Sequence, residues 1–297
     1  MGTCERRSPS AANPILSSIS QIQSSEGANY HGLQVTIQKR LTKGFSAQGF
    51  WVWSKSLQSL DIDTSGNTGN SATTQPEDNN LHYLDKMRSD YDQRHVVAAS
   101  VVWKPHYGFD NRFLRAVVND WTLTSIIRLQ SGLPFNISTG TDNNSDGVTN
   151  DRPNLVPGVV RPSLTNNGTS RSAMVKNWVS PLQFCSWNTP YTWNGTAVPT
   201  CPQQGVGPAG SDGTLRQNTL DAPGRRSIDA SIFRDFPIYE RLTFQLRGES
   251  TNVFNLTNLP APVGTLSSST TFGQITSAFS GGSFSNRIIQ VGGRILF

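Results

Sequence analysis

Hydrophobic and polar residues alternate along several short stretches of the chain. Between Leu33 and Ile37 every second residue is apolar, and the residues between them are polar. Successive side chains of a β-strand point to opposite faces, so this pattern predicts a strand with one apolar face and one polar face. Lys43–Gly44 favours a tight turn, and Trp51 and Trp53 share the apolar face of the strand that follows it. The sequence therefore predicts a β-hairpin here.

The same alternation recurs further along the chain, at residues 97–103, 121–130, 228–232, 242–249 and 289–297. Short connections alternate with long polar ones, and the long ones are residues 57–92 and 132–225. In outer-membrane barrels, short turns lie on the periplasmic side and long loops lie outside. We therefore expect an all-β fold, a partial antiparallel transmembrane β-barrel of about seven or eight strands with long extracellular loops.

Aromatic residues gather near the ends of the predicted strands. They are Trp51, Trp53, Trp103, Trp121, Phe254 and Phe297. Membrane barrels carry girdles of aromatic side chains at both interfaces, so the positions favour a membrane wall. The alternative is that these rings fill the dry core between the two sheets of a β-sandwich.

The composition narrows the classes of protein further. Of 297 residues, 35% are hydrophobic and 15% are charged, while 9% are aromatic. Few charges and many small polar residues fit strands joined by polar loops, and argue against a helical bundle. No apolar run approaches the roughly 18 residues of a membrane helix. The net charge is +5, but the basic residues are dispersed, so no nucleic-acid partner is expected.

A set of short motifs resembles the barrel strands of TonB-dependent outer-membrane receptors, specifically the Oar-like group. Each motif is weak, but their order covers nearly the whole chain. The matching segments are Asn29–Gln34, Lys39–Arg40, Trp51–Ser56, Asp92–His95, Asn119–Trp121, Ser131–Phe135, Asp151–Asn154 and Glu249–Asn255. The last segment, Arg287–Phe297, resembles the closing strand that the barrel assembly machinery binds.

The resemblance implies a function and a set of partners. A parent receptor would sit in the bacterial outer membrane and import or handle a large ligand, with a plug domain inside the barrel and energy supplied through TonB. Barrels of this kind have about 22 strands, and no signal peptide, plug domain or TonB-binding segment is visible here. Residues 1–297 are therefore expected to be a C-terminal barrel segment that does not transport alone. The expected partners are outer-membrane lipid, the barrel assembly machinery, and the parent's plug and TonB.

Two alternatives from other classes stay open. A stand-alone eight-stranded barrel, acting as an adhesin or a structural protein, would pair its first strand with its last strand. A secreted carbohydrate-binding β-sandwich would bury its apolar rows between two sheets. An enzyme is not expected, because neither a nucleophile motif nor a pair of catalytic carboxylates is evident, and no cofactor is expected either.

One loop carries the spacing of a calcium site. Oxygen-bearing side chains alternate at Asp142, Asn144 and Asp146, followed by a glycine where the backbone would turn, and Asp151 could complete the shell. The glutamate that closes an EF-hand loop is missing. The sequence therefore leaves two interpretations, a structural calcium site or an acidic turn, and composition favours the turn.

Two further sets of residues are candidates for function. Cys185 and Cys201 share one polar region and could form a disulfide in an oxidising compartment, or remain thiols. Polar residues opposite the apolar rows would face the lumen of a barrel, and the charged ones are Arg40, Arg128, Arg247 and Glu249. They could contact a plug or a ligand, or pair with one another.

Overall fold

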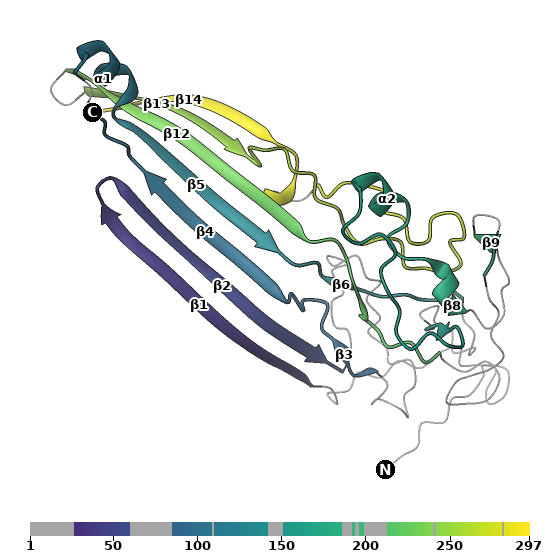
Figure 1. Cartoon of the computed structure of the whole chain (residues 1–297). Coiled ribbons are helices and arrows are strands. Elements are labelled where there is room, and N and C mark those ends of the chain that lie inside the picture. Colours follow the sequence, from purple (N-terminus) through teal and green to yellow (C-terminus); the bar gives the residue numbers. More distant parts are fainter. Residues whose placement is uncertain are drawn as a thin grey trace, which may run out of the picture.

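Seven long strands form one antiparallel sheet in the computed structural model (Figure 1). The structure describes residues 27–59, 85–108, 110–141, 151–185, 192–193, 196–198, 213–239, 242–280 and 282–297. The sheet order is β1-β2-β4-β5-β12-β13-β14, and the short β3 pairs with β2. Their bounds are β1 Ala28–Thr42, β2 Phe45–Gln58, β3 Met87–Arg88, β4 His95–Trp103, β5 Trp121–Gln130, β12 Arg225–Tyr239, β13 Leu242–Thr251 and β14 Ile288–Leu296.

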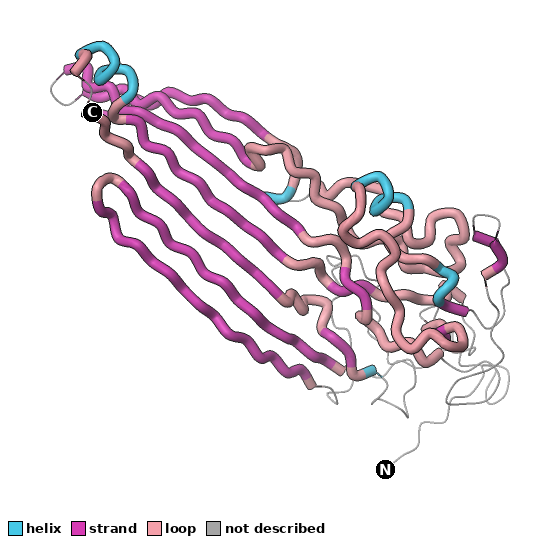
Figure 2. Tube along the Cα trace, viewed as in Figure 1, coloured by secondary structure: helices cyan, strands magenta, loops and turns pink. Residues whose placement is uncertain are grey.

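The short and the long connections lie at opposite ends of this sheet. Figure 2 shows the tight hairpins and the C-terminus at one end, and a mass of loops at the other. The β1–β2 turn needs left-handed backbone at Lys43 (φ 49°) and Gly44 (φ 75°). A Cβ at Gly44 would lie 2.2 Å from the carbonyl oxygen of Lys104, so this turn requires glycine.

Strand pairing places most of the apolar residues of the sheet on one face. Partners across an antiparallel pair share a face, and one row of partners runs through Ile37, Gly49, Ala99, Ile127 and Ile228. We call this the apolar face; it also carries Val35, Trp51, Trp53, Val97, Val101, Leu123, Leu129, Ile232, Leu246 and Val291. The opposite, polar face carries Gln34, Thr36, Gln38, Gln48, Ser100, Thr124, Arg128, Asp229, Ser231, Gln245, Arg247, Glu249, Gln290 and Arg294.

The apolar face is not covered by protein in the described part of the chain. Ile37 is 73% exposed and Val291 is 77% exposed. The remaining sheets among the described residues have two strands each and lie within residues 134–221. The apolar rows are therefore not stacked sheet against sheet, as a β-sandwich would require. They face outward, where acyl chains would cover them.

Aromatic side chains form two bands on the apolar face. Trp51 and Trp53 lie near the loop end, whereas Phe45 and its partner Trp103 lie near the turn end. From Phe45 to Trp53 the strand advances roughly 26 Å. At a tilt of about 40° this spans about 20 Å, close to the apolar band of roughly 25 Å in outer-membrane barrels. The spacing of the two bands therefore matches a membrane.

The two edges of the sheet are unpaired. Neither β1 nor β14 has a second neighbour among the described strands. Six successive antiparallel steps lead from β1 to β14, so the two edge strands run in the same direction. The described sheet therefore does not close on itself by an antiparallel pair. The seven described long strands alone therefore do not form the closed eight-stranded barrel, in which the first and last strands pair.

A packed lobe covers the loop end of the sheet. We call residues 131–224 and 252–287, where described, the loop lobe. Its buried cluster includes Trp178, Phe184, Leu266 and Phe272, although the sequence suggested polar loops. The misjudgement has a physical reason: these apolar residues follow no strand or helix period, so no face could be read from them. Its elements are β6 Pro134–Phe135, β7 Asn154–Leu155, α2 Arg171–Lys176, η2 Pro181–Gln183, β8 Phe184–Cys185, β9 Thr192–Trp193, β10 Thr196–Ala197, β11 Leu220–Asp221 and η3 Gly282–Phe284.

A short helix, α1 (Arg112–Val118), lies in the connection from β4 to β5, where the sequence suggested a simple reversal. The Asn111 side chain accepts hydrogen bonds from the N–H groups of Phe113 and Leu114 and caps the helix. Phe113 is 74% exposed at the turn end of the sheet. No helix among the described residues has the length and apolarity needed to cross a membrane.

The two faces predict opposite effects of the same substitution at adjacent positions. Ala99→Arg places a cation at the middle of the apolar face and should lower the free energy of unfolding in phospholipid vesicles by about 2–4 kcal/mol. Ser100→Arg places it on the polar face and should change that free energy by less than about 0.5 kcal/mol. Urea titration followed by tryptophan fluorescence measures both values. Equal losses would contradict the assignment of the faces.

Candidate functional site

Polar side chains pair with one another on the polar face of the sheet. Arg128 Nη1 donates to Asp229 Oδ2 across β5 and β12 at 2.6 Å. The other oxygen of Asp229 accepts from Ser227 Oγ at 3.0 Å and from the Asn252 N–H at 2.9 Å. The Arg128 side chain is 30% exposed, so its charge is balanced and still reachable from solvent. Of the described polar-face residues, these form the most fully bonded group.

The other charged residues expected in the lumen divide into two cases. Arg247 and Glu249 lie on the polar face of β13 and form an ion pair with each other. Arg40 lies in β1 where the register shifts between Lys39 and Thr42. Pairing therefore does not assign Arg40 to either face. Gln245 Nε2 donates to Asp235 Oδ1 at 2.8 Å and extends the polar face toward the turn end.

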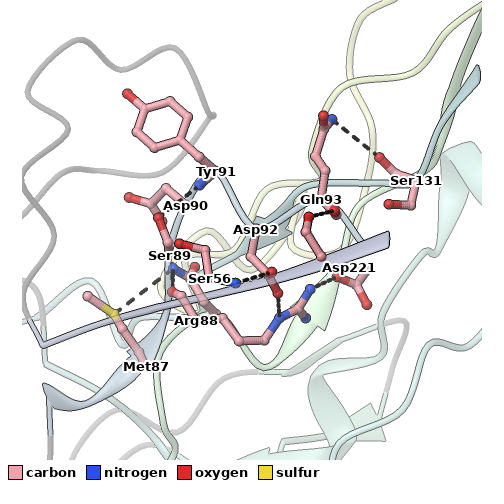
Figure 3. Close-up of polar contacts among 12 residues, drawn as sticks. Ser56, Met87, Arg88, Ser89, Asp90, Tyr91, Asp92, Gln93, Ser131 and Asp221 are labelled. Atoms are coloured by element: carbon pink, nitrogen blue, oxygen red, sulfur yellow. Dashed lines mark hydrogen bonds and ion pairs between the residues drawn. The ribbon is translucent and has the colours of Figure 1, made fainter. Parts of the chain in front are cut away.

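A buried cluster of charges joins the strands to the loop lobe (Figure 3). Arg88 Nε donates to Asp92 Oδ2 and Arg88 Nη2 donates to Asp221 Oδ1, both at 2.7 Å. Asp92 also accepts the N–H of Ser56 in β2 at 2.7 Å. The side chain of Asp92 is completely buried, whereas that of Asp221 is 50% exposed. One arginine therefore ties β3, the turn after it and β11 together.

Two further contacts complete this cluster. Asn218 Nδ2 donates to Asp90 Oδ1 at 2.6 Å and to the carbonyl of Arg88 at 2.8 Å. Arg152 Nη2 donates to Asp85 Oδ1 at 2.7 Å, and both side chains are almost fully buried. We call this set the buried junction; it comprises Asp85, Arg88, Asp90, Asp92, Arg152, Asn218 and Asp221.

The buried junction explains the acidic residues at the end of the first long connection. The sequence placed that stretch in a long polar connection, but Asp85, Asp90 and Asp92 are buried and bonded. Burial alone would lower the pKa of Arg88, yet its bonds to Asp221 and Asp92 raise the pKa on balance, so the guanidinium stays charged. The partners lie far along the chain, and no sequence signal links them. The contacts of the buried junction hold the loop lobe against the strands.

A groove opens at the loop end of the apolar face. Its volume is about 630 Å³. The apolar face contributes Val97 and Leu129, which are cross-strand partners, and α2 contributes Arg171 and Met174. Arg226 pairs with Leu129 and so lies on the same face. The sequence did not mark this groove, because it joins the ends of β4, β5 and β12 to α2, which are far apart along the chain.

The candidate calcium residues are only partly described. Asp142, Asn144 and Asp146 lie outside the described residues, while Asp151 is fully buried within the loop lobe. Its backbone carbonyl accepts from the N–H and the hydroxyl of Thr139, at 2.7 and 3.1 Å. Within the ranges that the structure describes, no three His, Cys, Asp or Glu side chains gather as a metal site. The calcium interpretation stays a prediction.

Only one of the two cysteines in the disulfide prediction lies within the described residues. Cys185 lies in β8, is buried, and is disulfide-bonded. Cys201, the expected partner, lies outside the described residues. The bond is made from a strand of the loop lobe that also carries the core residue Phe184. A disulfide at this position is consistent with an oxidising compartment.

Comparison with known proteins bears on the whole chain. A family model described as an outer membrane beta barrel domain matches residues 2–290. A comparison with curated proteins gives no match. The family match covers the first six long strands and the loop lobe, and it ends within β14.

The two carboxylates that share Arg88 predict different costs of removal. Asp92→Ala should destabilise the buried junction by about 3 kcal/mol, because Arg88 loses its buried partner and the Ser56 N–H loses its acceptor. Asp221→Asn removes a half-exposed partner and should cost less than about 1 kcal/mol. Amide hydrogen exchange at Ser56 and in β11 measures both changes. Similar exchange in the two variants would mean that the junction does not hold the lobe.

Proposed function

The chain belongs to the outer membrane beta barrel domain family of the bacterial outer membrane, and from this premise we propose that it forms part of the wall of a TonB-dependent transporter. The observation that carries the proposal is the unclosed sheet, apolar on one face and polar on the other. The apolar face would contact lipid. The polar face would line the lumen, which holds a plug and passes a ligand.

The direction of the edge strands limits how this wall is completed. Single-chain bacterial barrels have an even number of antiparallel strands, and β1 runs parallel to β14. An odd number of further strands must therefore lie between them. A ring of identical copies in one membrane orientation would bring β14 beside a parallel β1, so copies do not solve the problem. We propose that a parent receptor supplies further strands of the wall.

Several features support a receptor of the TonB-dependent kind. The motifs that resemble the Oar-like group recur in order along the strands and the lobe. The Arg128–Asp229 pair and the Arg247–Glu249 pair lie on the polar face, where a plug would contact them. The loop lobe stands at the end where such receptors first meet a large ligand. β14 would be the strand that the barrel assembly machinery binds.

Cross-linking distinguishes a wider barrel from a small closed one. In the outer membrane, Gln34→Cys on β1 combined with Gln290→Cys or Arg294→Cys on β14 should not react with a short thiol cross-linker, because other strands lie between them. The control is Gln34→Cys with Val52→Cys, whose residues are direct partners in β1 and β2, and it should cross-link. Efficient β1–β14 cross-linking, read by gel mobility, would contradict the wider barrel.

Binding of TonB tests the transporter class separately. A tagged C-terminal domain of TonB, added to detergent-solubilised outer membranes, should retain the intact protein that contains this chain. A porin from the same extract serves as the control and should not be retained. Retention is measured by immunoblot against the loop lobe. If the chain is left in the unbound fraction together with the porin, its barrel is not TonB-dependent.

A further inference from the structure

We propose that the groove at the loop end of the apolar face binds an anionic lipid of the outer membrane, with the headgroup in the groove and the acyl chains along the strands. The groove lies where the lipid-facing strands meet the loop lobe, and it is lined by residues of β4, β5, β12 and α2. The proposal rests on the position of the apolar face in lipid and not on transport.

The charged residues that line the groove are all arginines. Three arginines line it, Arg171, Arg225 and Arg226, and no aspartate or glutamate does. None of the three forms an ion pair with a residue that the structure describes. Elsewhere in the described chain, Arg88, Arg128, Arg152 and Arg247 all pair with carboxylates. The groove therefore offers positive charge to an external anion such as a phosphate.

The arginines are held in different ways. Arg171 Nη1 donates to Thr257 Oγ1 at 3.0 Å, which leaves its other N–H groups for a ligand. Arg225 stacks on the ring of Phe279 at 4.1 Å, so its guanidinium is oriented by the lobe. The backbone of Arg226 exchanges two hydrogen bonds with the side chain of Asn258, while its own side chain is exposed. Contacts of the backbone, of a ring and of a hydroxyl group thus hold the three arginines of the groove in place.

The floor of the groove continues onto the apolar face. Val97 and Leu129 line the groove, and Trp51 lies beside Val97 on the next strand. The Trp51 ring stacks on His95, which also lines the groove, at 5.9 Å between centroids. A soluble anion would use the arginines alone, whereas a lipid uses both the arginines and this apolar row. The volume of about 630 Å³ is in the range of small-ligand pockets, enough for a headgroup with its chains outside.

Native mass spectrometry of the full chain, purified in neutral detergent, tests the proposal. Dioleoyl-phosphatidylglycerol should be retained about tenfold more tightly than dioleoyl-phosphatidylcholine. Arg171→Gln combined with Arg226→Gln should weaken retention of phosphatidylglycerol by about tenfold or more. The matched control is Arg161→Gln with Arg216→Gln, which removes the same charge from exposed positions of the loop lobe outside the groove. It should leave retention unchanged.

Other outcomes would overturn the inference. Equal retention of the two lipids, or equal losses in the two double variants, would mean that the groove does not select an anionic lipid. Glycerol phosphate that binds as tightly as phosphatidylglycerol would mean a site for a soluble anion. Arg171→Lys with Arg226→Lys keeps the charge and should keep most of the binding, so a general folding defect would be recognised. Failure here would leave TonB binding and the β1–β14 result unchanged.

Discussion

A strand in the hydrocarbon core of a membrane must find hydrogen-bond partners on both of its edges, because no water is present to replace them. The interior strands of this sheet meet that requirement through continuous antiparallel pairing. The edges of β1 and β14 have no second partner among the described strands, and their common direction excludes an antiparallel pair between them. This constraint, more than any individual side chain, is the reason for proposing that the sheet is part of a larger wall.

The molecule separates its two kinds of hydrophobic residue. Most of those in the strands lie on the exposed apolar face and would be stabilised by lipid, whereas those of the loop lobe form a dry core around Trp178 and Phe272. The lobe therefore has its own source of stability outside the membrane. The buried junction connects the two parts through Arg88 and its carboxylates. The loop end of the sheet thus carries a packed lobe instead of free loops.

The pairing of charged residues differs between the sheet and the rim where it meets the loop lobe. Inside the sheet, charges on the polar face pair locally, as Arg128 does with Asp229. At the rim, α2 overhangs the apolar face, and the arginines there have no acidic partner among the described residues. A membrane protein gains from this arrangement because anionic headgroups lie at that depth. The rim would anchor the wall at a defined height in the bilayer.

The sequence alone determined the strands, their two faces and the alternation of short and long connections. Its period of two residues carries that information locally, as from Leu33 to Ile37, and the pairing register bears it out. The polar positions of Arg128, Arg247 and Glu249 followed from the same period. The helix α1 was missed, since seven residues give too short a pattern to detect.

Only the tertiary structure decided which residues that are distant in the sequence contact each other. The partners Arg152 and Asp85 are 67 positions apart, and the core around Trp178 draws on two separate connections. The groove and the relative direction of β1 and β14 likewise depend on how distant segments meet. Local periodicity determines which way a side chain points from its own backbone. It holds no information on which distant residue that side chain contacts. That choice is made by packing and by the burial of charge.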